Sequence, residues 1–501
     1  MNLYNPSEKK LLKNIGLLAY VNPFLPDRIK LEEKVLGKDF VDEENNWHVG
    51  ANPFGKRQNV QSIHILLDRM CRELQKKVTV LNNISSEDAE LYEDCVLFFL
   101  YYECIFDLEA AIVSEDSIES DQIIARCYQK YSEYFDFYFS HSVFKDTAQK
   151  DKSHLFSCFW QLLRAFYHIF MFISGSSKAS YTLRASVWES VFSYDIKRYR
   201  RTMYKFNSDI PILITGPSGS GKELVARAVG LSLYIPFDHR GSTFKVRFRD
   251  HFNAINLSSF SYSLIESELF GHVKGAFTGA MQDKKGWFEL GVSNSALFLD
   301  EIGDLDTTIQ VKLLRTLQAR SFHRIGSHQE RKLRGKVIFA THKNIANEIA
   351  AGKFREDFYY RICADTVSTP SLEEILSGSK EILQDSALYI LKKMFSDKEA
   401  EGLSIEISNW IKDSLGLHYN WPGNFRELEQ CISNYLLRKD YKPVNTKRDS
   451  NDWLKECISR ELSLDELTKA YVNGLYEKYG NYEEVARKLK VDRRTIKSKL
   501  L

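Results

Sequence analysis

Hydrophobic and polar residues follow three different patterns along this chain. From Met1 to about Tyr181, apolar residues recur at helical spacing, as at Ile63 and Leu67. This spacing predicts amphipathic helices after about Gln61. The residues before that point include several prolines and glycines, so we expect them to be less regular.

The second zone, from about Leu183 to Lys439, alternates short runs of β-branched residues with helical segments. The runs typical of buried strands are Ile210–Ile214, Ala296–Leu299 and Lys336–Ala340. Strands that alternate with helices predict a mostly parallel sheet with helices on both faces. A polar linker follows this zone, and the chain ends in a short helical tail.

The composition is that of a soluble globular protein with several domains: 501 residues, of which 44% are hydrophobic and 27% are charged. A formal net charge of +2 means that any DNA contact must come from a local basic patch. The eight cysteines include no Cys-x-x-Cys pair, and His154 and Cys158, one helical turn apart, lack a second ligand pair. Free thiols in a reducing cytosol are therefore favoured over a metal site.

One stretch, Leu155 to Ser174, is apolar enough to raise the question of a membrane span. It carries Gln161, Arg164 and His168 in its middle, and each of these would be costly in lipid. We therefore expect a buried helix and no membrane partner. The N-terminus shows no apolar signal-peptide segment, and we expect a cytoplasmic protein.

A glycine-rich segment follows the strand at Ile210–Ile214 and precedes a helical pattern from Leu224 to Leu233. Its residues, the expected ATP-binding set, are Gly216, Pro217, Ser218, Gly219, Ser220, Gly221, Lys222 and Glu223. A phosphate-binding loop needs this context, because glycines let backbone N–H groups surround phosphate oxygens and the helix N-terminus adds its positive dipole. Lys222 would neutralise the β- and γ-phosphates. This motif alone leaves open an ordinary glycine-rich turn.

An acidic pair, Asp300 and Glu301, follows the strand Ala296–Leu299. We expect Asp300 to hold Mg²⁺, directly or through water, and Glu301 to polarise the attacking water as general base. Adjacent carboxylates at a strand end are often only solvated. The glycine-rich segment upstream in the same α/β zone favours ATP hydrolysis instead.

The segment between these motifs, Glu266 to Ala280, has the sequence ESELFGHVKGAFTGA. It resembles the bacterial enhancer-binding proteins, the AAA+ activators of sigma-54 RNA polymerase, whose hallmark is the hexapeptide GAFTGA. The hexapeptide is intact here, as Gly275, Ala276, Phe277, Thr278, Gly279 and Ala280. The resemblance runs from about Val187 to Leu436 and implies that this loop contacts the sigma factor. An exposed Phe between glycines is a good docking element, although a hairpin with an inward Phe remains the alternative.

The resemblance implies roles for further residues. Asn256 matches an asparagine that pairs with the glutamate of the acidic pair, here Glu301, and links the nucleotide state to the loop. Arg355 and Arg361, in FREDFYYR, match arginines that reach the neighbouring subunit's nucleotide, where such fingers stabilise the transferred phosphoryl group. Arg426, in WPGNFREL, matches the lid arginine that touches the γ-phosphate.

Some positions depart from the family pattern. Thr341 and His342 lie where the family places its first sensor, but His342 stands where asparagine is common. Pro217 and Ser220 replace a usual Glu and Thr in the phosphate-binding loop, which should be tolerated. Glu223 matches the family, so no Mg²⁺-binding hydroxyl is required there. Two family arginines after Arg361 are replaced by Glu373 and Ile375, which affects subunit packing rather than ATP chemistry.

The tail reads as two short helices, Tyr482–Leu489 and Arg493–Leu500, with Asp492 as N-cap of the second. Two short helices joined so tightly predict a helix-turn-helix whose second helix enters the major groove of DNA. From Tyr482 to Leu501 there are seven basic and three acidic residues, which supplies the basic patch that the whole chain lacks. The tail also resembles the Fis-type DNA-binding domain. The candidates for DNA contact are Arg493, Arg494, Thr495 and Lys497, and a solvated basic hairpin is the alternative.

The sequence thus predicts a multidomain protein: a mainly α-helical N-terminal regulatory domain (1–180), an α/β AAA+ P-loop ATPase with a parallel sheet (183–376) and helical lid (377–440), a linker (441–460), and a C-terminal helix-turn-helix (461–501). Aromatic residues of the first domain are expected to pack its core rather than line a ligand pocket. The resemblance implies a ring, of six subunits, that binds ATP and Mg²⁺, upstream double-stranded DNA and the sigma-54 RNA polymerase holoenzyme. Two other functions remain: a DNA-binding regulator that no longer remodels polymerase, and a AAA+ remodeller of another target.

Overall fold

The computed structural model describes residues 3–43, 57–81, 83–114, 117–245, 252–377, 380–416, 419–443, 463–479 and 481–500. The chain divides into two compact units, residues 1–439 and 440–501. Each unit is described by itself below.

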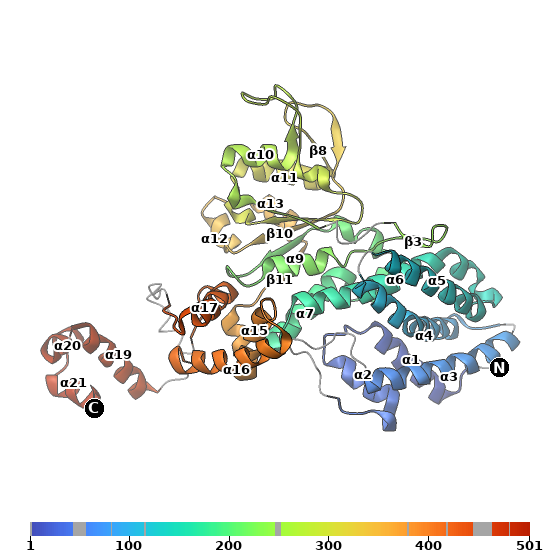
Figure 1. The fold of residues 1–501 in the computed structure, drawn as a ribbon, viewed down its shortest axis with the longest axis horizontal. Helices are drawn as coiled ribbons and strands as arrows, with labels where there is room; N and C mark the ends of the chain where they lie inside the picture. Colours follow the sequence, from blue (N-terminus) through green and yellow to red (C-terminus); the bar gives the residue numbers. More distant parts are fainter. Residues whose placement is uncertain are drawn as a thin grey trace. The chain divides into compact units, whose positions relative to one another are not determined.

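The N-terminal part of the first unit is helical (Figure 1, blue to cyan). Its helices are α1 (Pro6–Tyr20), α2 (Asp27–Leu36), α3 (Gln58–Val80), α4 (Ser86–Val113), α5 (Ile118–Tyr138), α6 (Lys145–Phe172), α7 (Lys178–Phe192) and α8 (Ile196–Arg201). Serine side chains cap the first turns of three of them, at Ser85, Ser117 and Ser177. The prediction of a mainly helical N-terminal region is confirmed.

The expectation of an irregular start is wrong for residues 6–36, which form α1 and α2. A strong start signal precedes α1: Asn5 accepts the N–H of Glu8, and the Glu8 carboxylate accepts the N–H of Asn5, which makes a capping box. Pro6 follows at the first helical position, where its missing N–H costs nothing. The prolines therefore mark helix starts here.

Helix α6 is long and apolar enough to cross a membrane over Asp151–Phe172, but 72% of that window is buried inside the protein. Gln161, Arg164 and His168 are all buried in it. The helix packs against α4, α7 and α9 (Lys222–Gly230). This is the arrangement of a core helix.

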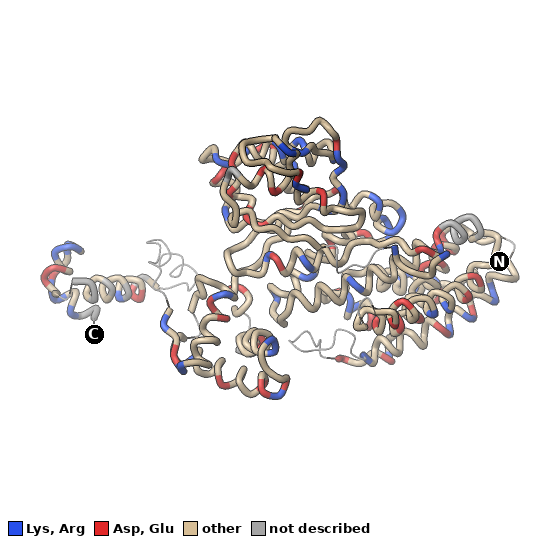
Figure 2. The backbone as a smooth tube through the Cα atoms, turned by 45° about the horizontal axis from the view of Figure 1, so that its top comes forward, with Lys and Arg blue, Asp and Glu red and all other residues tan. Residues whose placement is uncertain are grey.

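A parallel sheet of five strands forms the centre of the first unit, with the order β11-β1-β10-β7-β4. Its strands are β1 (Ile212–Thr215), β4 (Phe252–Asn256), β7 (Ala296–Asp300), β10 (Lys336–Thr341) and β11 (Asp365–Ser368). Every neighbouring pair is parallel. Figure 2 shows these central strands almost free of charged residues, which lie instead on the surrounding helices and loops.

Alternate residues of each strand enter two separate cores. Ile212 and Ile214 face a core shared with α6, α7 and α9. Leu213 faces the other core, which it shares with α10 (Tyr262–Phe270), α11 (Thr307–Ala319) and α13 (Glu356–Ile362). Burial on both faces explains why the strands are continuous hydrophobic runs.

The predicted domain boundary at 180–183 falls inside α7. The structure corrects it, because α7 contacts both β11 and α9 and its Val187 and Val191 are fully buried in the sheet core. Helices α6 and α7 therefore complete one face of the ATPase sheet. The sequence could not show this because the contact is made in three dimensions, far from the motifs.

Two small hairpins project from the sheet: β5 (Gly271–His272) with β6 (Lys284–Lys285), and β8 (Ser321–His323) with β9 (Glu330–Lys332). A third pairs β2 (Phe237–Asp238) with β3 (Thr243–Phe244). The helix α12 (Ile345–Ala350) follows β10. The lid comprises α14 (Leu372–Leu376), α15 (Lys380–Leu391), α16 (Asp397–Ser414) and α17 (Asn424–Arg438).

The second unit contains α19 (Leu464–Tyr479), α20 (Tyr482–Leu489) and α21 (Arg493–Leu500). Its small core includes Val472, Val485, Ala486 and Ile496, contributed by all three helices. The last two helices have the predicted bounds. The predicted linker lies outside the described residues from 444 onward.

Candidate nucleotide site and its projecting loop

The phosphate-binding loop lies between β1 and α9. Gly216, Gly219 and Gly221 all have positive φ values, of 147°, 76° and 89°. A Cβ on Gly216 would lie 2.0 Å from the Thr369 hydroxyl, and one on Gly219 would lie 2.5 Å from the Gly423 carbonyl. Only glycine fits at either point, so the loop leaves a bare backbone cradle of the kind that suits phosphate oxygens.

Lys222 opens α9 and is buried, with 7% of its surface exposed. Its Nζ donates to the carbonyls of Gly216 and Pro217, each at 3.1 Å. Burial lowers the pKa of Lys222, and the charges of Glu301 and Asp300 act in the opposite direction. The ammonium group thus lies within the electrostatic reach of both carboxylates, at the mouth of the loop.

The acidic pair ends β7. The Glu301 N–H donates to Asp300 Oδ1 at 3.0 Å, and Glu301 itself is held at a φ of 59°. Burial raises the pKa of Asp300, and the neighbouring Glu301 charge adds to the rise. A cation placed here would offset both the burial of the Asp300 carboxylate and its repulsion by Glu301. Carboxylate oxygens are the donors that Mg²⁺ prefers. The residues present therefore fit a magnesium nucleotide.

The Glu301 carboxylate contacts His342 rather than Asn256. Its Oε2 lies 2.7 Å from His342 Nδ1 and accepts the His342 backbone N–H at 3.3 Å. Asn256 lies beside Asp300 in the strand register, but its Oδ1 accepts the N–H of Ser258 at 3.0 Å. Thr341 is buried, and its hydroxyl accepts the N–H of Lys343 at 3.1 Å.

The lid reaches the phosphate-binding loop directly. Arg426 Nη1 donates to the Ser218 hydroxyl at 3.2 Å, and Asn424 Nδ2 donates to the Ser218 carbonyl at 2.9 Å. The Phe425 N–H donates to the Gly219 carbonyl at 3.1 Å. The structure thus brings Arg426 to the site where the sequence places it.

Two residues of the site were not singled out by the sequence. Asn424, at a φ of 52°, joins the loop to the lid, since its Oδ1 also accepts the Leu372 N–H at 2.8 Å. It lies inside the WPGNFREL string, which could have revealed it. Thr369 lies with its hydroxyl 2.6 Å from that of Ser220, and no sequence signal marks it.

Arg355 immediately precedes α13 and Arg361 lies within it, and the two arginines make different contacts. Arg355 is exposed and forms a two-point pair with Asp357, at 3.0 and 2.8 Å. Arg361 is half-buried and donates to the Leu317 carbonyl at 2.7 Å. Within the described residues, no hydrogen bond or ion pair joins either arginine to the phosphate-binding loop of its own chain. Glu223 pairs instead with Arg227, one turn along α9.

The GAFTGA segment forms the tip of the β5–β6 hairpin. The Gly275 N–H donates to the Ala280 carbonyl at 2.9 Å, which closes the loop. Gly275 and Gly279 have φ values of 81° and 102°, and a Cβ on either would meet nothing within 4 Å. Phe277 is 43% exposed, and its ring lies edge-on to that of His272, with ring centroids 5.0 Å apart. The Phe is therefore presented outward from an open loop.

The loop base is fixed by the second hairpin. Val273 and Ile325 are joined by an N–H···O bond of 3.1 Å, and the Ile325 N–H donates to the Gly271 carbonyl at 2.9 Å. A Cβ on Gly326 would lie 2.8 Å from Ala276 Cβ. The hairpin base and Ala276 therefore pack closely against the second hairpin, whereas Phe277, Thr278 and Gly279 are exposed.

In the tail, Asn481 caps α20 and Lys490 ends it at a φ of 56°. Asp492 Oδ1 accepts the Arg494 N–H at 2.7 Å and so caps α21. The candidate DNA-contact residues, all of them exposed, are Arg493, Arg494, Thr495 and Lys497. Arg493 also pairs with Glu483 at 2.9 Å.

Comparison with known proteins decides the nature of the central segment. Residues 193–368 match the family model of the Sigma-54 interaction domain. This segment is a sigma-54 interaction domain. It is a domain of the AAA+ ATPase class, and the sequence-based prediction of that class, with its parallel sheet, is confirmed.

The chain is similar over part of its length to named regulators. It is 35% identical over 309 residues to the transcriptional regulatory protein ZraR of Klebsiella oxytoca, covering 58% of this chain and 63% of ZraR. It is 43% identical over 230 residues to the sigma54-dependent transcriptional activator SfnR of Pseudomonas putida, covering 46% of this chain and 57% of SfnR. The chain thus spans less than two thirds of the length of these relatives.

Among solved structures, the chain is similar to NtrX from Brucella abortus in complex with ATP. The TM-score is 0.38 and the identity is 24%, over 65% of this chain and 68% of NtrX.

Proposed function

We propose that this protein is an ATP-dependent transcriptional activator that remodels sigma-54 RNA polymerase through its GAFTGA loop. The observation that carries the proposal is the outward Phe277 on an open hexapeptide loop of the sigma-54 interaction domain. An exposed aromatic side chain of this kind is suited to docking on another protein. The relatives named as sigma-54-dependent activators and transcriptional regulators agree with this function.

ATP hydrolysis is assigned to the residues that meet at the carboxyl ends of the central strands. The loop backbone and Lys222 bind the phosphates, and Arg426 closes the lid over them. Asp300 would hold Mg²⁺, which when bound would neutralise charge on the phosphates. Glu301 takes a proton from the attacking water as general base.

A contact path connects this chemistry to the projecting loop. Ser258, between β4 and α10, donates its hydroxyl to Asp304 Oδ2 at 2.7 Å, and Asp304 lies three residues after Glu301. Lys343, next to His342, pairs with the same carboxylate at 2.7 Å. Helix α10 then leads straight into β5 and the GAFTGA tip. A displacement of Glu301 during ATP hydrolysis is therefore transmitted to the GAFTGA loop through these few contacts.

The active form is a ring of six subunits in the cytoplasm. Arg355 and Arg361 face a neighbour's nucleotide in this proposal, which accounts for their lack of a contact with their own phosphate-binding loop. The C-terminal unit binds double-stranded DNA upstream of the promoter through α21. Its exposed basic residues suit phosphate contacts, and such binding weakens steeply as salt concentration rises.

The test compares open-complex formation by sigma-54 polymerase with ATPase activity on the same samples. We expect Thr278→Ala to hydrolyse ATP at the wild-type rate and to form no open complexes. Met281→Ala is the matched control, because Met281 is 83% exposed on the same hairpin but lies outside the hexapeptide. It should behave as wild type in both assays. A wild-type protein that hydrolyses ATP but never opens a sigma-54 promoter would overturn the proposal.

A further inference from the structure

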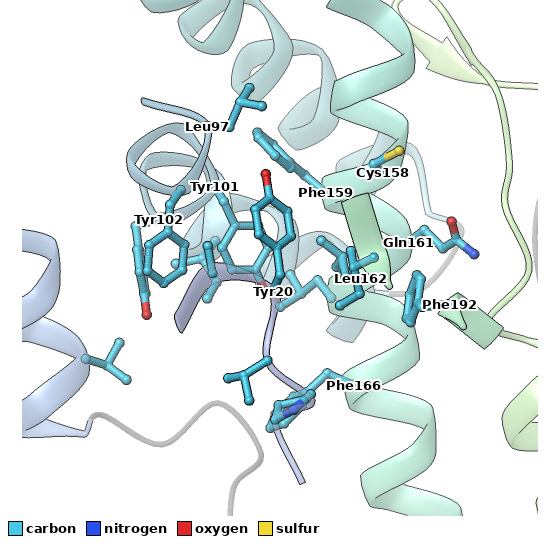
Figure 3. A pocket seen from close by; sticks show the side chains of 18 of the residues that line it. Tyr20, Leu97, Tyr101, Tyr102, Cys158, Phe159, Gln161, Leu162, Phe166 and Phe192 are labelled. Carbon is cyan, nitrogen blue, oxygen red and sulfur yellow. The ribbon is translucent and has the colours of Figure 1, made fainter. Parts of the chain in front are cut away.

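A cavity of about 200 Å³ lies among the N-terminal helices, away from the residues of the nucleotide site (Figure 3). Residues of α1, α4, α6, α7 and α8 form most of its wall. Aromatic side chains dominate it, among them Tyr20, Tyr101, Phe159, Phe166 and Phe192. A dry cavity of about 150 Å³ is enough to hold benzene, so this one has room for a one-ring or two-ring aromatic molecule.

The charged groups at the wall are neutralised by carboxylates of the protein. Arg28 and Arg57 both pair with the buried Glu32, at 2.9 and 3.0 Å, and Arg57 also pairs with Glu43 at 3.3 Å. Arg200 pairs with Glu93 at 2.7 Å. No excess positive charge is left to bind an anion, which favours a neutral ligand.

One polar group at the wall, the carboxyl of Glu109, has no hydrogen-bond or ion-pair partner among the described residues. A ligand that offers it a hydrogen bond would be stabilised. Burial raises the pKa of Glu109 to about 7, which allows it to donate or accept near neutral pH.

We propose that this cavity is an effector site for a small neutral aromatic molecule that carries a hydroxyl or carbonyl oxygen. The carboxyl of Glu109 forms a hydrogen bond with that group, and the aromatic wall covers the ring. The aromatic residues of this region thus do more than pack a core.

A ligand in this cavity can affect the nucleotide site through contacts between α6 and α9. This effect on ATP hydrolysis rests on the function proposed above. Gln161 lies in the cavity wall, and its Nε2 donates to the Ser232 carbonyl at 3.0 Å. One turn along α6, Arg164 Nη1 donates to the Leu231 carbonyl at 3.1 Å. These carbonyls follow the last turn of α9, whose first residue is Lys222. A shift of α6 on ligand binding therefore moves the helix that carries the phosphate-binding lysine.

The test titrates 2-naphthol into the full-length protein by isothermal calorimetry. We expect saturable binding at one site per chain, and about tenfold weaker binding of the anion 2-naphthalenesulfonate, because burying an unpaired charge is costly. Ala19→Trp, which fills the cavity from α1, should abolish binding. Leu17→Trp, on the same helix with its side chain 60% exposed, should leave binding unchanged.

Two further variants sharpen the result. Val60→Trp fills the cavity from α3 and guards against misfolding of Ala19→Trp, and it should also abolish binding. Glu109→Leu should weaken binding by roughly fivefold through loss of one hydrogen bond. No binding by the wild type, or equal binding by a folded cavity-filling variant, overturns the site.

The ATPase rate and the affinity for a fluorescent ATP analogue are measured on the same samples with and without 2-naphthol. We expect 2-naphthol to change at least one of them severalfold in the wild type and neither in Val60→Trp. Binding without any such change overturns the route through α6 but supports the site. Binding to a protein that does not hydrolyse ATP overturns the proposed function and supports the site.

Discussion

Glu301 Oε2 lies 2.7 Å from His342 Nδ1 and also accepts the backbone N–H of His342. An ionised carboxylate can only accept, so the imidazole nitrogen is the donor. Both bonds end on the same carboxylate oxygen, and among the described residues none is hydrogen-bonded to the other oxygen, which suits it to accept from a water molecule. His342 therefore orients the general base at the end of β7, in a chain whose Asn256 contacts Ser258 instead.

This relationship predicts the effect of changing His342. His342→Ala removes the side-chain donor and should lower kcat for ATP hydrolysis about tenfold, because a mispositioned base is inefficient. His342→Asn keeps an N–H donor on a shorter side chain and should retain most of the activity. Steady-state ATPase assays, with ATP affinity measured separately, check this. Equal loss in both variants would show that the bond to Glu301 does not orient it.

The contacts of Arg355 and Arg361 predict different consequences for their removal. Arg355→Ala leaves the fold intact, since its pair with Asp357 is exposed, but should lower kcat by about 10³-fold through loss of transition-state charge stabilisation. Arg361→Ala should also lower the melting temperature, because Arg361 holds the Leu317 carbonyl.

A mixing experiment tests whether Arg355 acts on a neighbour. Lys222→Ala chains lack a working phosphate-binding loop but keep Arg355, and Arg355→Ala chains have the reverse defect. Each variant alone should be inactive, and the mixture should recover part of the ATPase activity at the mixed interfaces. A mixture as inactive as its components would contradict action in trans.

The sequence predicts those parts of the fold that local patterns specify. The strands β1, β7 and β10 were visible because both of their faces are buried, which makes them unbroken apolar runs. Helix α20 was visible because its apolar residues recur at helical spacing, and α21 because Asp492 caps it. The glycines of the phosphate-binding loop were visible because positive φ values exclude other residues.

The missed features depend on contacts between distant segments. Nothing local shows that Arg164 reaches the end of α9, or that the Thr369 hydroxyl lies beside Ser220. The pairing of Glu301 with His342 depends on how β7 and β10 align. The predicted domain boundary at residue 180 was wrong for the same reason. Truncation at that residue would expose the sheet core that α6 and α7 cover.

The N-terminal helices contain an acid-sensitive contact at Glu103. Its carboxylate accepts from His64 Nε2 at 2.8 Å and from Lys130 Nζ at 2.9 Å. The hydrogen bond from His64, with the contribution of Lys130, lowers the pKa of Glu103 to about 2 from an ordinary value of 4.5. The stability from this contact is therefore complete above pH 4.5 and is lost as the pH falls toward 2.

Glu103→Gln should make the melting temperature fall less steeply between pH 5 and about pH 3. The wild-type protein loses this ion-paired contact over that range, whereas the variant has no carboxylate to protonate. Glu119→Gln, at an exposed position on α5, should keep the wild-type pH dependence. Parallel curves for wild type and Glu103→Gln would show that this carboxylate contributes nothing to acid sensitivity.

Arg164 connects the N-terminal helices to the ATPase sheet and predicts a stability effect. It is fully buried and donates to the Leu231 and Leu233 carbonyls, beyond the last turn of α9. Arg164→Met keeps much of the volume but removes the donors, so we expect a loss of about 3 kcal/mol in the free energy of unfolding. Urea denaturation measures it, and Arg69→Met, at an exposed position on α3, should stay within about 0.5 kcal/mol of wild type. If Arg164→Met unfolds at the wild-type urea concentration, the two carbonyls do not depend on Arg164 and the α6–α9 contact is held by apolar packing alone.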